Sequence, residues 1–147
     1  MKEHQLRSDC PINYPLEIVG DKWSLLIIRD IAIFGKTSYG EFLSSDEKIA
    51  TNILSNRLSM LEANGIISKK RHATNKTKSI YSLAQPGLDL IPLLIEMLIW
   101  SVKQRPIEIG PDALLAEMAV SDRQQLINAI QTHLQAGNEG PFIQTLQ

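Results

Sequence analysis

Apolar side chains recur at spacings of three and four residues along most of the chain, a pattern typical of amphipathic helices. The first helix is predicted to begin around Pro15 and to stop at Gly20, after which Asp21 can cap a second helix over residues 22–34. Gly35 follows as a stop signal. We expect this second helix to be the central element, because it carries apolar residues on several faces. Its main apolar stripe contains Trp23, Leu26, Ile27, Ile31 and Phe34.

A short helix and then a longer one are predicted between residues 38 and 64. Ser38 and Glu41 have the spacing of a capping box, in which their side chains bond to the first free backbone N–H groups of the short helix. The longer helix covers residues 50–64 and ends at Asn64–Gly65. One of its faces is apolar, and the other carries short polar side chains: Thr51, Asn52, Ser55, Asn56 and Ser59.

The period of the pattern then changes from helical to extended. Residues 66–72 and 79–83 are short and rich in residues that favour strands, and the polar stretch 73–78 between them is typical of a turn. The sequence therefore predicts an antiparallel hairpin.

From Pro86 the helical spacing returns, and one long helix with two apolar stripes is predicted. A helix with two such stripes needs two surfaces to cover them, and a partner helix from another subunit would supply one of them. The first stripe contains Leu88, Ile91, Ile95, Leu98 and Val102. The second stripe, which we predict to form a dimer interface, contains Leu90, Leu93, Met97 and Trp100.

Residues 104–147 are predicted to be a largely helical C-terminal extension. Pro111–Asp112 can open a helix through Ala119, and Ser121 with Gln124 can cap another one that ends at Ala136–Gly137. Three roles remain open for this extension: it can cover the second apolar stripe, enlarge a dimer or form a small ligand pocket. We therefore divide the chain into a domain at 1–103 and an extension at 104–147.

The length of 147 residues and the 44% hydrophobic content fit one soluble domain with an appendage. The net charge of −1 is distributed unevenly along the chain. Residues 50–85 carry six Lys or Arg and one Glu, a net charge of +5, whereas residues 1–49 and 86–147 have net charges of −2 and −4. A basic segment inside an acidic protein is the pattern expected where a local surface meets a polyanion.

Several other classes are not supported by the sequence. The apolar run 90–100 is shorter than the roughly 20 residues of a membrane-spanning helix, and no apolar block of a signal peptide follows the N-terminal charges, so we expect a cytoplasmic protein. There is no glycine-rich phosphate loop, nucleophile elbow or metal-ligand spacing, and the three histidines are scattered. We expect no catalytic residues, no metal and no cofactor.

The predicted order of elements describes a winged helix-turn-helix: a mainly α fold with a small β-hairpin, a long dimerisation helix and a helical tail. In such a fold the helix at 50–64 enters the major groove of DNA. The amides of Asn52 and Asn56 can each donate to and accept from a base edge, and Arg57 can pair with phosphate or guanine. Thr51 and Ser55 can reach phosphates or bases. The hairpin would follow the sugar-phosphate backbone through its cations: Lys69, Lys70, Arg71, Lys76 and Lys78.

Five segments in order resemble the HxlR family of bacterial transcriptional regulators, and the likeness covers roughly residues 10–103: Cys10–Ile12, Gly20–Asp30, Tyr39–Phe42, Ile49–Leu58 and Leu61–Ile67. The resemblance implies a dimeric winged-helix DNA-binding protein whose N-terminal segment and long helix form the dimer contact. It also implies that Cys10 matches an N-terminal cysteine that senses oxidants or electrophiles in some relatives. Residues 106–147 lie outside the resemblance.

We predict a homodimeric transcriptional regulator, a repressor rather than an activator, that reads a pseudo-palindromic operator. Two alternatives stay open. The wing can instead bind an acidic protein partner, without specific DNA binding. Cys10 can be an inert thiol, because reactivity requires nearby cations or a helix N-terminus that lower the pKa of the thiol. A small-molecule effector is compatible with this prediction, and its identity is open.

Overall fold

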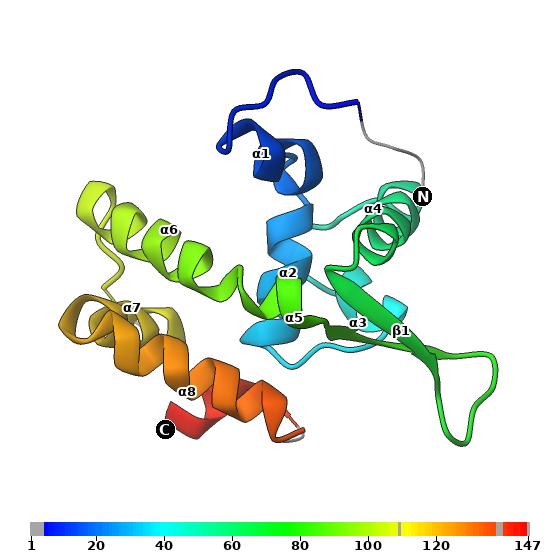
Figure 1. Cartoon of the computed structure of the whole chain (residues 1–147). Helices are drawn as coiled ribbons and strands as arrows, with labels where there is room; N and C mark the ends of the chain where they lie inside the picture. The colour runs from blue at the N-terminus through cyan, green and yellow to red at the C-terminus, as the bar shows by residue number, and fades with distance from the viewer. Residues whose placement is uncertain (1–4, 109, 138–139, 147) are drawn as a thin grey trace.

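The computed structural model describes residues 5–108, 110–137 and 140–146. It confirms a mainly helical fold with one small hairpin, and the elements follow in the predicted order (Figure 1). They are α1 (Asn13–Val19), α2 (Ser24–Ala32), α3 (Tyr39–Leu43), α4 (Thr51–Ala63), β1 (Ile67–Arg71), β2 (Ser79–Leu83), α5 (Gln85–Leu88), α6 (Ile91–Gln104), α7 (Pro111–Ser121), α8 (Arg123–Gln135) and the 3-10 helix η1 (Phe142–Leu146).

Local capping chemistry acts at the start of two helices. Helix α2 begins at Ser24 with Trp23 at its N-cap position, two residues later than predicted, and the Asp21 carboxylate accepts the backbone N–H of Trp23 at 2.8 Å and that of Ser24 at 3.0 Å. At α3 the capping box of Ser38 and Glu41 is complete, because each side chain accepts a backbone N–H from the other residue. The two strands form an antiparallel pair in which Ile67 faces Leu83 and Arg71 faces Ser79.

Helix α2 lies at the centre of the N-terminal part of the molecule, as its apolar faces predict (Figure 1). Ile28 is fully buried, and Trp23 is partly buried against the same cluster. The cluster joins α1, α2, α3, α4 and the hairpin through these buried residues: Ile18, Val19, Ile27, Ile28, Ile31, Phe42, Ile49, Leu54, Leu58, Leu61, Ile66, Ile67 and Tyr81. Burial of this apolar surface stabilises the arrangement of α3 and α4 against α2.

A second cluster holds the C-terminal extension against α6. Ile91, Ile95 and Ile99 are buried there together with Leu126 and Ile130 of α8. Helices α7 and α8 therefore cover the first apolar stripe of α6. The expectation that the extension could cover the second stripe is wrong, because Leu93, Met97 and Trp100 remain exposed on the protomer.

The long helix predicted from Pro86 onward is divided into two. Helix α5 ends at Leu88 and α6 begins at Ile91. Pro92 explains the break, because it has no N–H to donate to the carbonyl of Leu88 and its ring would clash with that carbonyl in a continuous helix. The Leu88 carbonyl instead accepts the side-chain amide of Gln131 from α8 at 3.2 Å. The break thus provides a polar contact for the extension.

The cap predicted at Ser121 is also wrong. Ser121 is the last residue of α7, and its hydroxyl donates to the Glu117 carbonyl. Asp122 caps α8 in its place, since its carboxylate accepts the N–H of Gln125 at 3.0 Å. Both residues are favourable caps, and the backbone of Asp122 leaves the helical conformation first.

The extension also contacts the end of α2. Gly35 has φ +65°, and a Cβ on it would lie 2.7 Å from the backbone carbon of Gly140. Nearby, the N–H of Ile143 donates to the carbonyl of Ile33 at 3.1 Å. Gly35 is therefore required twice, for the left-handed turn after α2 and for the close approach of the two backbones.

The helical segment Gln85–Gln104 is 20 residues long and has a mean hydropathy of 1.3. By length and composition alone, this segment could cross a membrane. The sequence-based expectation considered only the apolar run 90–100, which is shorter than this segment. In the fold the segment is divided between α5 and α6, one face of α6 is buried by α7 and α8, and Glu96 forms an ion pair with Arg123. Its apolar character is used there for packing against the extension.

Candidate nucleic-acid interface

The outward face of α4 presents the polar side chains that the hydrophobic pattern predicts there. Thr51, Asn52, Ser55 and Asn56 are exposed, while Leu54, Leu58 and Leu61 hold the opposite face in the core. The face therefore offers two amides and two hydroxyls without burying any of them. This is the surface that a helix needs in order to read base edges in a major groove.

Tyr39 holds the first turn of α4 in place, and the sequence did not predict Tyr39 as a site residue. Its hydroxyl donates to the Thr51 carbonyl at 2.9 Å and lies 3.2 Å from the hydroxyl of Ser55. Because Tyr39 is the first residue of α3, this contact joins the two helices of the helix-turn-helix. Tyr39 could have been found from the sequence, because it belongs to Tyr39–Phe42, one of the segments that carry the family resemblance.

Arg57 has a partner inside the protein. Its guanidinium lies 3.3 Å from the carboxylate of Asp21, and both side chains are partly buried. Burial raises the pKa of Asp21, but hydrogen bonds from Ser24 and Trp23 and the positive charge of Arg57 outweigh it, so the net pKa lies below its usual value. Arg57 therefore ties α4 to the start of α2, and its remaining N–H groups stay available for phosphate.

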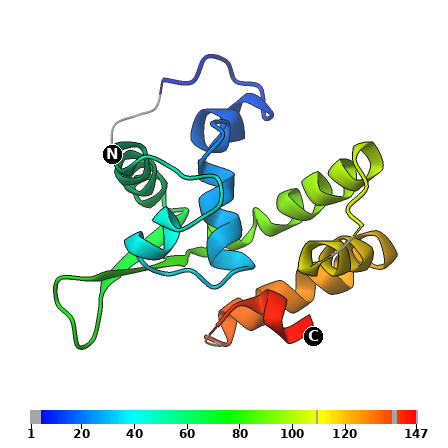
Figure 2. The same cartoon turned by 180° about the vertical axis from the view of Figure 1, so that it is seen from behind.

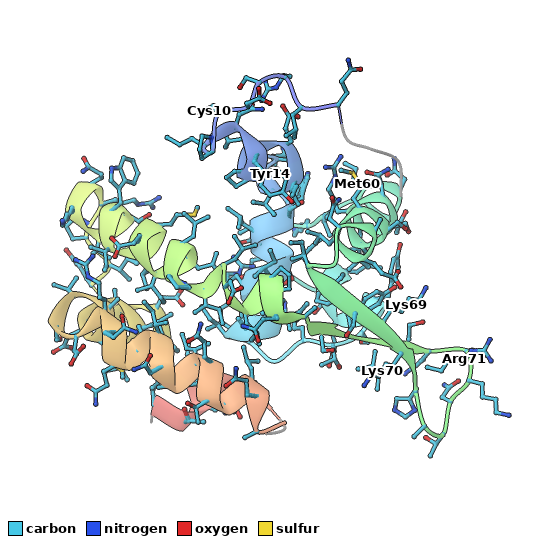
Figure 3. All side chains as sticks on the ribbon, in the orientation of Figure 1. Cys10, Tyr14, Met60, Lys69, Lys70 and Arg71 are labelled. Carbon is cyan, nitrogen blue, oxygen red and sulfur yellow. The ribbon has the colours of Figure 1, made fainter. Side chains whose placement is uncertain are left out.

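The hairpin presents the predicted cations to solvent. Lys69, Lys70 and Arg71 are exposed on β1 (Figure 3), and Lys76 and Lys78 are exposed in the turn. Two sets of hydrogen bonds shape the turn. The ring nitrogen Nδ1 of His72 accepts the N–H groups of Thr74 and Asn75, and the Asn75 side chain accepts the N–H of Thr77. The cations therefore project from a hydrogen-bonded turn.

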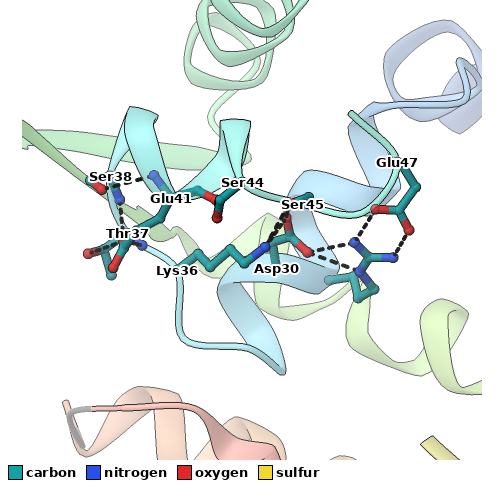
Figure 4. Close-up of polar contacts among 9 residues, drawn as sticks. Asp30, Lys36, Thr37, Ser38, Glu41, Ser44, Ser45 and Glu47 are labelled. Carbon is teal, nitrogen blue, oxygen red and sulfur yellow. Dashed lines mark hydrogen bonds and ion pairs between the residues drawn. The ribbon is translucent and has the colours of Figure 1, made fainter. Parts of the chain in front are cut away.

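A buried ionic network sets the path of the chain between α3 and α4 (Figure 4). Asp30 is only 3% exposed, and its carboxylate accepts hydrogen bonds from Arg29, Lys36 and the hydroxyl of Ser45. The other side of the Arg29 guanidinium bonds to Glu47, and these bonds lower the pKa of Glu47 to about 2. The loop that leads into α4 is thus held to α2 by ion pairs.

Helix α4 and the hairpin lie on the same side of the molecule, and α7 and α8 lie on the opposite side (Figures 1 and 2). Helix α4, with its exposed polar side chains, and the basic hairpin therefore both lie on the side of the protomer that the extension leaves free. This juxtaposition is the one that a winged helix-turn-helix needs in order to contact a groove and its flanking phosphates together.

Cys10 lies away from this interface, in the exposed segment before α1 (Figure 3). The backbone N–H groups of Asn13 and Ile12 lower the pKa of its thiol. The thiol is thus accessible and shifted toward the thiolate. Within residues 5–108, 110–137 and 140–146, no three His, Cys, Asp or Glu side chains gather closely enough to hold a metal ion.

The predicted dimer stripe is exposed in three of its four members. Leu93, Met97 and Trp100 are exposed, and Trp100 reaches 65%. The fourth member, Leu90, is partly buried and packs against the first core cluster at the break between α5 and α6. Helix α1 and the residue before it add a second exposed apolar group: Ile12, Tyr14 and Leu16.

A helix-turn-helix with an outward polar helix, followed by a basic hairpin, defines the class of winged-helix transcriptional regulators. Comparison with known proteins agrees with this class. The model of the HxlR-like helix-turn-helix family matches residues 18–108, and the chain belongs to that family. The chain is therefore a transcriptional regulator of the helix-turn-helix type, and DNA binding is the activity of its fold.

Individual relatives support the same assignment. The chain is 32% identical over 97 residues to an uncharacterised HTH-type transcriptional regulator, BH0655, of Halalkalibacterium halodurans. The aligned residues cover 66% of this chain and 86% of that protein. It is similar to the crystal structure of PA1607, a proposed transcription factor, with 35% identity, a TM-score of 0.63 and coverage of 71% and 72% of the two chains. It is also similar to the redox regulator HypR in its oxidised form, with 25% identity, a TM-score of 0.57 and coverage of 67% of this chain and all of that one.

Proposed function

We propose that the protein is a cytoplasmic homodimer that represses transcription by binding a pseudo-palindromic operator. The observation that carries this proposal is that α4, whose polar side chains are exposed, lies on the same side of the molecule as the basic hairpin (Figure 1). In the dimer, the two α4 helices enter successive major grooves about one helical turn apart, and the two hairpins follow the flanking phosphates. A protein that occupies two adjacent grooves in this way blocks access of polymerase to a promoter.

Within this proposal the residues have separate tasks. Asn52 and Asn56 read base edges, because each amide offers a donor and an acceptor. Thr51, Ser55 and Arg57 contact phosphates or bases at the edge of the groove. The cations of the hairpin bind backbone phosphates and supply affinity that does not depend on sequence: Lys69, Lys70, Arg71, Lys76 and Lys78.

The test is binding of the full chain to a labelled duplex from its own upstream region, compared with a scrambled duplex at several salt concentrations. We expect tighter binding to the upstream duplex by a factor of about a thousand or more, with a steep salt dependence on both duplexes. Equal affinity for the two duplexes, without a salt slope, would instead favour a winged-helix module that binds protein.

Lys70→Ala is expected to weaken binding to both duplexes by the same factor, because a phosphate contact carries no sequence information. The slope of log affinity against log salt should fall by about 0.9 for each phosphate that the protein no longer neutralises, and by twice that in a dimer. Lys103→Ala, an exposed lysine at the end of α6, is the control and should leave the slope unchanged. A slope in Lys70→Ala equal to that of the wild type would remove this residue from the interface.

The dimer is supported by the exposed apolar residues of α1 and α6. Leu93, Met97 and Trp100 form a stripe on the face of α6 that α7 and α8 leave open. Exposed apolar stripes of this kind mark interaction surfaces, and tryptophan is enriched among residues that dominate binding energy. We therefore propose that α6 and α1 of one protomer pack against those of a second copy.

Trp100→Asp is expected to weaken the dimer by about 2 kcal/mol or more, since it places a charge in the proposed interface. Sedimentation velocity over a concentration series measures the effect. Asn128→Asp, which places the same charge at an exposed position on α8 outside the proposed interface, serves as the control. A monomer–dimer equilibrium equal in wild type and Trp100→Asp would contradict the assignment of this stripe.

We further propose that Cys10 makes DNA binding responsive to oxidants. Its exposure and lowered pKa support this role, and so does the likeness to the redox regulator HypR. The thiolate would attack a peroxide oxygen, which breaks the O–O bond, releases water or an alcohol after protonation, and leaves a sulfenic acid. A second thiol, from the other protomer or from a small-molecule thiol, would then form a disulfide and release water.

In Cys10→Ser, DNA binding is expected to become indifferent to peroxide, because the chain contains no other cysteine. The measurement is operator affinity before and after peroxide treatment, for wild type and variant, followed by reduction with dithiothreitol. We expect the wild type to change affinity reversibly. An identical peroxide response in Cys10→Ser would exclude Cys10 from the mechanism.

A further inference from the structure

A cleft of about 500 Å³ lies between the DNA-binding half of the molecule and the C-terminal extension. One wall is formed by β2 and by the loop between α2 and α3, at Gly35 and Thr37. The opposite wall is formed by the last turn of α8, residues 133–135, and by Gly137 and Gly140. Its volume falls in the range of small-molecule sites, which often lie at the junction of two structural units.

The described walls of the cleft contain no lysine, arginine, aspartate or glutamate. Apolar side chains contribute from both sides, among them Ile31, Leu83 and Leu134, and hydrogen-bonding groups stand between them at Thr37, Ser82 and Gln135. A charged ligand would lose its hydration here without gaining a lysine, arginine, aspartate or glutamate among these described residues. The lining therefore fits an uncharged molecule with an apolar body and polar substituents.

His133 strengthens the wall on the side of the extension. It is buried, its Nε2 lies 3.2 Å from the carbonyl of Gly140, and its ring packs edge-on against Phe142. Gly35, on the facing wall, approaches the backbone of Gly140 so closely that a Cβ would not fit. The two walls are thus held at a fixed separation by packing at one end of the cleft, and a ligand does not have to create the space.

The cleft adjoins the base of the hairpin. Thr37 and Tyr81 both line it, and the N–H of Tyr81 donates to the Thr37 carbonyl at 2.8 Å. Tyr81 pairs in the sheet with Lys69, and Thr37 lies two residues before Tyr39, which contacts α4. A molecule in the cleft would therefore touch the residues that connect the hairpin to the helix-turn-helix.

We propose that this cleft is the binding site for an uncharged small organic molecule, and that occupancy changes affinity for DNA through the Thr37–Tyr81 contact. The second half of this proposal rests on the proposed function, whereas the binding site itself does not. The ligand binds between β2 and α8, with its apolar body against Ile31, Leu83 and Leu134 and its polar groups toward Thr37, Ser82 or Gln135.

The test uses full-length protein with labelled Ile and Leu methyl groups and follows them by NMR. The probes are 2-naphthol and indole, which are neutral at pH 7, and 2-naphthoate, which has a similar ring and a negative charge. Both neutral probes are expected to shift the methyl signals of Ile31, Leu83 and Leu134, with dissociation constants near about 1 mM or below. 2-Naphthoate is expected to bind at least about tenfold more weakly.

Two variants, Gln135→Trp and Ser82→Trp, narrow the cleft from opposite walls, and both positions are exposed. Each should weaken binding of 2-naphthol by about tenfold or more. The matched control is Thr132→Trp, at an exposed position on α8 outside the lining. The site is overturned if neither neutral probe shifts these methyl signals, if 2-naphthoate binds as tightly, or if Thr132→Trp weakens binding as much as the other two.

Operator affinity with and without saturating 2-naphthol tests the coupling. We expect a change of about threefold or more in wild type and none in Gln135→Trp. Methyl shifts without a change in operator affinity would overturn the coupling and leave the site. If the protein fails to select its upstream duplex at all, the proposed function fails, while the methyl titration still decides the site.

Discussion

Asp30→Ala is expected to lower the free energy of unfolding by about 3 kcal/mol. Asp30 is buried, and it accepts hydrogen bonds from Arg29, Lys36 and Ser45. Its loss leaves the Ser45 hydroxyl buried without this acceptor and removes one of the two carboxylates that neutralise Arg29. The effect should lie near the lower end of the range for broken buried pairs, because Arg29 keeps Glu47 and Lys36 can turn to solvent.

Urea unfolding followed by circular dichroism measures this loss. Asp46→Ala removes an exposed carboxylate from the same loop and should change stability by less than about 0.5 kcal/mol. Equal midpoints for the two variants would show that the network around Asp30 does not stabilise the approach to α4.

The double variant Asn52→Ala/Asn56→Ala is expected to lose about 2–6 kcal/mol of discrimination between operator and scrambled duplex for each protomer on its half-site, or about 1–3 kcal/mol for each amide that contacts a base. Both residues are exposed on α4, so their removal should leave the fold and the salt slope unchanged. The measurement is the ratio of the two dissociation constants at one salt concentration.

Asn128→Ala is the control for the asparagine variants, because Asn128 is exposed on α8, on the side of the molecule away from α4. We expect it to keep the wild-type ratio. If the double variant also keeps that ratio, the assignment of base reading to these amides is wrong.

The features predicted correctly from the sequence are those that local chemistry determines. The caps at Asp21 and Ser38 need only neighbouring backbone N–H groups, and the hairpin follows from a change of period over a few residues. The polar face of α4 also follows from period alone. These are the elements that place the candidate interface, and for that reason the interface could be predicted in outline.

The features missed from the sequence depend on contacts between distant segments. Both stripes of α6 look alike in sequence, and only the packing of α8 decides that Ile91, Ile95 and Ile99 are covered. Likewise, no local pattern indicates that Tyr39 contacts Ser55 or that Arg57 pairs with Asp21. The cleft beside β2 is formed by three separate parts of the chain, between Ile31 and Gly140, and spacing carries no signal for such a site.

The measurement that tests the interface most directly is cleavage of the operator by a phenanthroline–copper group attached at single cysteines in the Cys10→Ser background. Three positions suffice: Ser59→Cys on the outward face of α4, Ala73→Cys in the turn of the hairpin, and Asn128→Cys on α8, all of them exposed. We predict cuts at the centre of each half-site from Ser59, cuts at the flanks from Ala73, and none from Asn128. Cuts directed from Asn128, or an intact operator with the label at Ser59, would contradict the placement of α4 in the groove.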